Sequence, residues 1–347
     1  MKKIVGIVAA LWLLCSTLGM ASNAVQLADA IEWPATMKAY GGKLLLSDSP
    51  ETVYGEGVLY QDTVVGEARL FFHHVNANDK PCRIAVIVEN QGMKTAKVQV
   101  LQQGLGGPGL DFLVVGKQAQ MDYLKGGNVY QFEVPGRSSL SMSPRLDRMV
   151  VETNALVNGI FDFKTDRPVR IRVLMMPAEA NPIRFAYLAQ VLPADQYRLR
   201  GTFEGKDRLI TLAKPYNAKI PWPVAVTLAD NKLDPYQRGI DATDGSSTVN
   251  YGNYGVVYKV QWDSRPGDTL NYYLNPRGGE YAGGLGIKYK ERKIQVPTPA
   301  DRLFFGTSTV KESELIGSYE GGQPVWFTFS PPGASNLPVR LVVEPSR

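Results

Sequence analysis

The sequence predicts a mainly β protein: an antiparallel β-sandwich with one or two short helices, followed by a second β-rich unit. Short β-prone runs separated by turn-forming clusters recur from Lys43 onwards. Glycine (34) and proline (23) are too frequent for a helical bundle and ordinary for a protein of many strands and turns. A hydrophobic fraction of 44% in 347 residues is enough to build one large or two ordinary domain cores.

The N-terminus predicts an export signal over residues 1–24. Lys2 and Lys3 give it a positive start, an apolar run follows, and Ser22 and Ala24 are small residues at the −3 and −1 positions of a cleavage site. The run is shorter than a membrane span requires, and no later stretch reaches about 18 consecutive apolar residues. We therefore expect a secreted protein without a transmembrane span, in the periplasm, at the cell surface or outside the cell.

The first predicted unit, residues 36–193, is the sandwich. Both faces of the run 83–89 are apolar, which predicts a central strand, whereas Lys97 and Gln99 alternate with valines, as in a strand with one wet face. Seven runs in about 130 residues are typical of a sandwich. They are 53–60, 67–75, 83–89, 97–103, 129–134, 149–157 and 169–176.

Two helices interrupt this pattern. Apolar residues recur at helical spacing between Leu110 and Leu124, which predicts a helix across one end of the sandwich. Asn181 and Pro182 fit the N-cap and first position of a second helix that continues over 183–191. We place the boundary with the second unit, residues 196–347, just after this helix.

The second unit is rich in tyrosine, with nine of the chain's 17 tyrosines between Tyr216 and Tyr289. Sugar rings stack on flat aromatic faces, and aromatic residues with polar tips suit a wet binding surface. The pattern therefore indicates wall polysaccharide as a partner. The alternative is that the aromatic residues form a core, because Tyr258, Val260 and Trp262 share one face of a strand. The candidate ligand-binding residues are Trp222, Asn250, Tyr251, Tyr254 and Tyr281.

No residue pattern predicts a catalytic centre or a cofactor, so we expect a non-enzymatic protein. The two histidines, His73 and His74, are adjacent in a strand-like run and point to opposite faces, so they cannot share one metal ion. Cys82 is the one cysteine left after signal removal, and its apolar run predicts a buried thiol. The net charge of +5 is small and scattered, which argues against nucleic acid.

Two loops have alternative interpretations. Asp241 and Asp244 form a weak calcium candidate, although the loop lacks regular calcium-site spacing and could be a solvated turn. The glycine-rich stretch 278–286 resembles a phosphate loop but lacks the Lys-Ser/Thr that would follow, so it predicts a tight hairpin.

The segments 70–76, 84–92 and 104–109 resemble secreted proteins of Gram-positive-related bacteria, some of which are labelled copper amine oxidase N-terminal-domain proteins. The similarity extends through 214–217 and 250–252. It implies an envelope or extracellular β protein. The oxidase motifs are absent: Ser247 and Gly252 depart from the cofactor-tyrosine pattern Thr-x-x-Asn-Tyr-Asp/Glu, and three copper histidines cannot come from two.

We expect an exported structural or adhesive protein of the cell envelope that binds wall polysaccharide or other envelope proteins. One alternative is a secreted glycan hydrolase, which needs two facing acids about 5 to 10 Å apart in a cleft. Another is a self-assembling surface protein, including a homo-oligomer, for which an exposed strand edge would be the sign.

Overall fold

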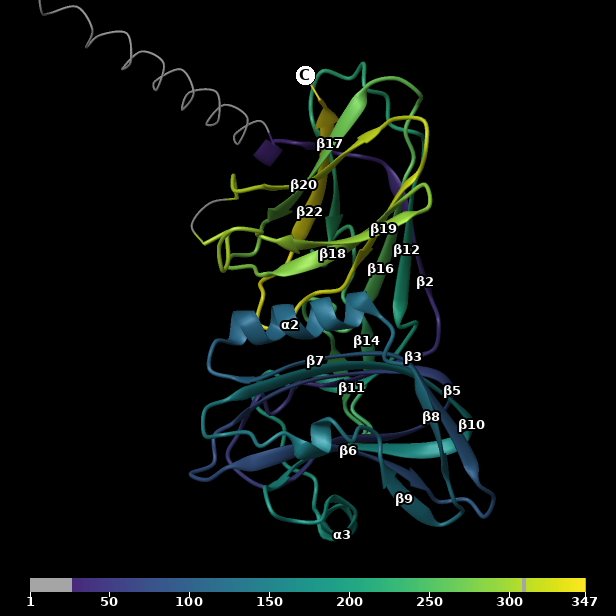
Figure 1. Ribbon diagram of the computed structural model, residues 1–347, viewed down its shortest axis with the longest axis vertical. Helices are drawn as coiled ribbons and strands as arrows, with labels where there is room; N and C mark the ends of the chain where they lie inside the picture. Colours follow the sequence, from purple (N-terminus) through teal and green to yellow (C-terminus); the bar gives the residue numbers. More distant parts are fainter. Residues whose placement is uncertain (1–26, 308–309, 347) are drawn as a thin grey trace, which may run out of the picture.

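The computed structural model describes residues 27–307 and 310–346. With 52% strand and 8% helix it confirms the predicted β-rich fold class. The elements form two stacked halves, and α2 (Phe112–Lys125) lies between them (Figure 1). The predicted export signal lies outside the described residues. Within the described ranges, no helix is long and apolar enough to cross a membrane.

The lower half is one strongly folded eleven-stranded sheet. Its centre is the antiparallel pair of β5 (Gly57–Asn76) and β10 (Leu156–Pro177). The other edge of β10 is shared, because β7 (Ala96–Gly109) pairs with its first part and β6 (Cys82–Asn90) with its last. The sheet thus folds over its own core of Phe72, Phe161 and Phe163. The remaining strands are β3 (Lys43–Ser47), β4 (Thr52–Val53), β8 (Tyr130–Val134), β9 (Ser138–Ser141), β11 (Arg200–Glu204), β14 (Arg238–Ile240) and β15 (Ser247–Val249).

The upper half is a sandwich of two sheets. Trp262, Tyr258 and Phe327 fill the space between them without solvent exposure, which confirms the core interpretation of the 258–262 strand. One sheet has the order β1 (Ile31–Glu32), β13 (Val224–Leu228), β22 (Val339–Pro345), β17 (Thr269–Pro276), β20 (Glu314–Glu320). The other has the order β19 (Arg292–Thr298), β18 (Gly283–Tyr289), β21 (Val325–Phe329), β16 (Val257–Trp262), β12 (Asp207–Leu212), β2 (Ala35–Tyr40).

Several local predictions for the first unit are confirmed, but the strand predicted over 149–157 begins only at Leu156, and the helix predicted to reach residue 191 ends at Leu188. β6 is buried along nearly its whole length between β10 and β9, and β7 alternates buried valines with exposed Lys97 and Gln99. α2 begins at the N-cap Asp111, whose side chain accepts a hydrogen bond from Val114 N. α3 (Pro182–Leu188) begins at Asn181, whose side chain accepts from Arg184 N. Cys82 is fully buried.

The two halves exchange strands across residue 193. β2 belongs to the upper sandwich, whereas β11, β14 and β15 extend the lower sheet. The tight hairpin predicted over 278–286 is wrong, because β17 and β18 lie in different sheets and the segment between them is a corner. The corner needs glycine because a Cβ on Gly278 would lie 2.1 Å from Leu337 O.

A buried ionic cluster, comprising Arg69, Tyr123, Asp162, Lys206 and Asp207, joins the halves. The Arg69 guanidinium forms a bidentate pair with Asp162 (2.6 and 2.9 Å) and lies 2.9 Å from Asp207. Tyr123 of α2 donates to Asp162 Oδ2 (2.9 Å), and Lys206 Nζ lies 3.4 Å from the same atom. Two cations balance two carboxylates, which is the condition for keeping charges buried.

Candidate functional site

The structure places the predicted ligand-binding residues in different environments. Trp222 (49% exposed) and Tyr251 (55% exposed) present their rings to solvent. Tyr254 is partly buried, and its hydroxyl donates to Ser335 O (2.7 Å). Asn250 and Tyr281 are fully buried, so neither presents a side chain to a ligand at the surface.

The two exposed aromatics lie at opposite ends of β13. Trp222 lies shortly before the first residue of β13. At the other end of the strand, Ala229 N donates to Asp234, in the loop whose Tyr236 ring contacts Tyr251. Five strand residues span roughly 17 Å at about 3.3 Å each, so the two rings do not form one platform. Tyr251 packs edge-on against Tyr236, with ring centroids 6.0 Å apart.

The calcium candidate is contradicted by its neighbours. Asp241 is buried and pairs with Arg200 Nε (2.7 Å), and Asp244 pairs with Arg198 Nη2 (2.5 Å). Hydrogen bonds from Ser246, and after them the Arg198 pair, lower the pKa of Asp244 to about 2. Arginine therefore occupies the carboxylates that a calcium ion would need. Among the described residues, no group of three or more potential His, Cys, Asp or Glu ligands is placed to hold a metal ion.

A polar groove lies instead on the face of β8, β7 and β10, and we call it the ladder groove. Cross-strand pairing sets Gln131 beside Gln99, and Gln99 beside Lys164. The next row sets Glu133 beside Lys97, whose backbone N–H donates to Asp166 (2.7 Å). Because alternate strand residues share a face, all six side chains project from one side, and all six residues are exposed.

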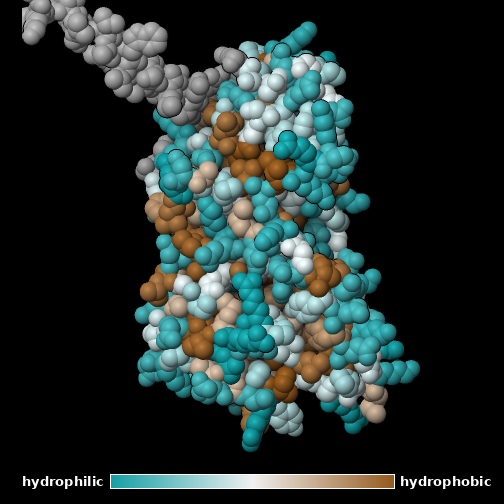
Figure 2. Space-filling model, in the orientation of Figure 1, coloured by the Kyte–Doolittle hydropathy of each residue, from teal (hydrophilic) through white to brown (hydrophobic). Residues whose placement is uncertain are grey.

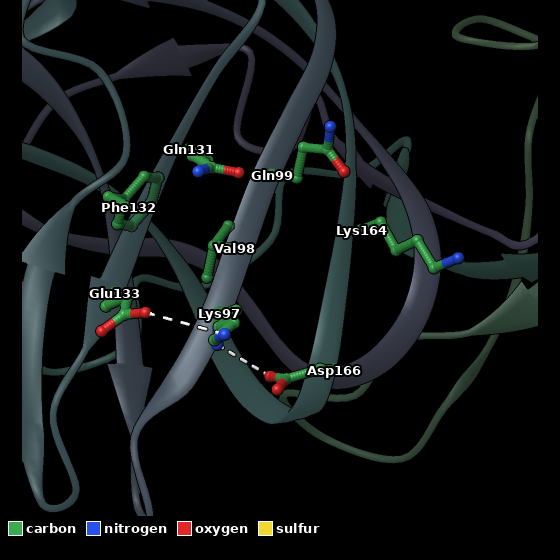
Figure 3. A pocket seen from close by; sticks show the side chains of 8 residues that line it. All are labelled: Lys97, Val98, Gln99, Gln131, Phe132, Glu133, Lys164 and Asp166. Carbon is green, nitrogen blue, oxygen red and sulfur yellow. Dashed lines mark hydrogen bonds and ion pairs between the residues drawn. The ribbon is translucent and has the colours of Figure 1, made fainter.

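The ladder groove has a volume of about 520 Å³, and Val98 and Phe132 complete its lining. Figure 3 shows Lys97 between Glu133 and Asp166, with Gln99, Gln131 and Lys164 farther along the strands. Lys97 Nζ lies 4.0 Å from Glu133 Oε1, a loose and exposed ion pair. The side chains of Gln99, Gln131 and Lys164 make no hydrogen bond or ion pair with the described part of the chain, so they are available to a ligand.

The chemistry of this groove is hydrogen bonding to uncharged polar groups. Each amide both donates and accepts, the two lysines donate and the two carboxylates accept. Two positive and two negative side chains leave the lining without net charge. In the view of Figure 2, hydrophobic residues gather in small separate groups among hydrophilic ones, so that face offers no broad apolar platform.

The carboxyl group whose pKa is raised most lies outside the ladder groove, near the junction of the two halves. Burial, with the nearby charges of Glu51 and Asp195, raises the pKa of Asp48 well above its usual value. Glu51 Oε1 lies 3.7 Å from His73 Nε2, and burial lowers the pKa of His73 to about 3. Asp48 is 9% exposed, so this acid is part of the interior rather than the lining of an open cleft.

The structure therefore defines a class, a mainly β protein of two stacked halves with a polar groove on one sheet. No protein-family model and no curated protein matches the chain. The CUB1-EGF-CUB2 domains of rat MASP-1 are similar over 91% of this chain and 99% of theirs, at 9% identity and a TM-score of 0.22. The 7S globulin of Momordica charantia is similar over 77% of this chain and 70% of its own, at 9% identity and a TM-score of 0.13.

Sequence reasoning missed the ladder groove. Its residues come from three segments, 97–99, 131–133 and 164–166, of which only the first drew attention, as the wet face of a strand. The sequence contains only a weak indication of this groove, because Gln99, Gln131 and Lys164 are ordinary surface residue types. Only the pairing of β7 with both β8 and β10 brings them together.

Proposed function

We propose that the protein is an exported, non-catalytic component of the cell envelope that binds wall polysaccharide in the ladder groove. One observation supports it above all: two adjacent rows of exposed polar side chains, with both amides unpaired, in a groove of about 520 Å³. A sugar chain presents hydroxyls that both donate and accept hydrogen bonds, which matches amides flanked by charges of both signs.

The charge balance supports an uncharged ligand over an ionic one. Lys97 and Lys164 are offset by Glu133 and Asp166, so the groove attracts neither a polyanion nor a polycation strongly. An extended partner also suits the site, because its six side chains lie in two rows across β8, β7 and β10 rather than close around a point.

The test is sedimentation of the purified mature protein, residues 25–347, with isolated cell-wall sacculi that carry their polysaccharides. We expect retention at low salt that persists at high salt, because hydrogen bonds to neutral sugars are screened little. Retention that disappears in salt would mean only general attraction of a basic protein. No retention at either salt concentration would contradict the proposal.

Variants locate the site. The double variant Gln99→Ala/Gln131→Ala should reduce retention about fivefold or more, since each lost hydrogen bond contributes about 0.5–1.5 kcal/mol. The matched control is Gln190→Ala/Gln323→Ala, which removes two exposed amides elsewhere. If Trp222→Ala or Tyr251→Ala abolishes retention and the groove pair does not, the ligand binds at the predicted aromatic residues instead. Equal thermal midpoints must show that every variant is folded.

A further inference from the structure

The strand β2 forms a free edge of the upper six-stranded sheet. It pairs only with β12, over Ala35 to Tyr40, without a register shift. Five of its six residues are exposed, and Met37 is half-buried. Its sequence, ATMKAY, contains no proline or glycine and one charge, Lys38. Such a strand presents an uninterrupted row of backbone hydrogen-bonding groups to solvent.

The pairing with β12 fixes which groups point outward. Ala213 N donates to Pro34 O (2.8 Å), so residue 34 and every second residue after it bond to β12. The N–H and C=O groups of Ala35, Met37 and Ala39 therefore point to the free edge. Nothing in the described part of the chain makes a hydrogen bond to them.

The other strands at sheet ends are short or protected. β1 and β4 have two residues, β15 three, β9 four and β8 five. β20 has a register shift at its centre and glutamates at both ends. β19 has Arg292, Lys293 and Pro297, the charges and proline that natural proteins use to block edge pairing. β2 combines length, regularity and exposure without these features.

We propose that β2 is a dimerisation edge, where it pairs antiparallel with β2 of a second copy about a two-fold axis at Met37. In this register Met37 faces its own counterpart, and Ala35 of each copy faces Ala39 of the other. Every outward N–H and C=O then finds a partner. A shift by two residues in either direction would leave one of the three outward residues without a partner inside β2, so the centred register uses the edge most completely.

The space beside the edge fits this arrangement. A hollow of about 230 Å³ opens next to β2, lined by residues including Trp33, Met37, Ile210 and Leu233. Met37 packs on the same face as Ile210, the residue it pairs with in β12. The Met37 of the second copy would point to that same face. Its side chain would therefore reach this apolar hollow, and the contact is reciprocal.

The register makes a prediction about charge. On the outer face, Thr36 of each copy lies directly opposite Lys38 of the other, and this pair occurs twice in the dimer. Lys38 has no ion-pair partner among the described residues, so it is available. Thr36→Glu should therefore tighten the dimer and Thr36→Lys should weaken it, each by about three- to tenfold. Both variants lose the same hydrogen bond, Thr36 Oγ1 to Thr211 Oγ1 (2.8 Å), so each controls for the other.

The experiment is analytical ultracentrifugation of the mature chain from about 1 µM to about 500 µM, a range that detects weak dimers. We expect a monomer–dimer equilibrium. Ala39→Pro removes an outward N–H that the β12 ladder does not use and should leave a monomer. Ala39→Val keeps that N–H and should still dimerise. Circular dichroism checks that both are folded.

The outcomes separate clearly. A wild-type protein that stays monomeric throughout this range overturns the proposal. A dimer that withstands Ala39→Pro in a folded variant, or that responds with the same sign to Thr36→Glu and Thr36→Lys, uses another surface and also overturns it. The ladder groove is on a different sheet, so neither result depends on polysaccharide binding.

Discussion

The charge balance of the buried ionic cluster predicts a large cost for Asp162→Asn. Asp162 holds Arg69 through two bonds and also accepts from Tyr123. The substitution keeps the shape and removes one of two negative charges, so Arg69 and Lys206 share only Asp207. Removing one partner of a buried ion pair costs about 3–5 kcal/mol. Because Asp207 remains 2.9 Å from Arg69, we expect the lower end, about 3 kcal/mol.

Urea unfolding followed by circular dichroism measures this loss. The double variant Arg69→Met/Asp162→Leu is the comparison, because it removes one charge of each sign and leaves Lys206 and Asp207, 3.2 Å apart, as a balanced pair. We expect it to cost clearly less than the sum of its two single variants, since no uncompensated charge remains buried. A loss below about 1 kcal/mol for Asp162→Asn, or additive single variants, would refute the charge-balance argument.

The pH dependence gives an independent check. Burial alone would raise the pKa of Asp162, but the charge and hydrogen bonds of Arg69, together with Lys206 and Tyr123, outweigh it and hold the pKa below its usual value. A carboxyl group with a lowered pKa in the folded state stabilises the fold above about pH 4 and loses that contribution as pH falls through the folded pKa. The difference in unfolding free energy between wild type and Asp162→Asn should therefore be largest at neutral pH and smaller in acid.

Three further predictions concern stability. Burial lowers the pKa of His73 to about 3 and of His74 to about 4. As the pH falls below about 6.5, the unfolded chain therefore binds protons at these histidines before the folded chain does, and the free energy of unfolding should fall by about 1.4 kcal/mol per pH unit for each histidine. His73→Leu should roughly halve the slope of unfolding free energy between pH 6 and 5, and an unchanged slope would exclude His73 as its source. Gly104→Ala should cost about 1–3 kcal/mol in urea unfolding, because its Cβ would lie 2.2 Å from Ala119 O of α2. Gly66→Ala should cost less, because its Cβ would meet open space and only the strain of its positive φ would remain. Millimolar calcium should leave the thermal midpoint unchanged, because Arg200 and Arg198 already pair with Asp241 and Asp244; a clear rise would show that an ion displaces them.

Local patterns were readable from the sequence, whereas long-range pairing was not. Asn181 and Pro182 predict the start of α3, because helix capping depends on a few adjacent residues. The alternation around Lys97 is likewise local. By contrast, the partners of β2 and β11 lie on the other side of residue 193. The buried state of Asn250 and Tyr281 is also set by remote segments, and a tyrosine-rich stretch reads the same in a core as on a surface.

The ladder groove shows why even a correct strand pattern does not locate a site. In β7, Gln102 faces Asp162 on the side of α2, and simple alternation would then put Val100 and Val98 on that same side. A register shift between Asp162 and Phe163 inserts one extra residue in β7, so Val100 faces Phe163 in the core and Gln99 faces Lys164. A β-bulge of this kind reverses which residues point outward. The polar groove therefore depends on an irregularity that residue types alone do not mark.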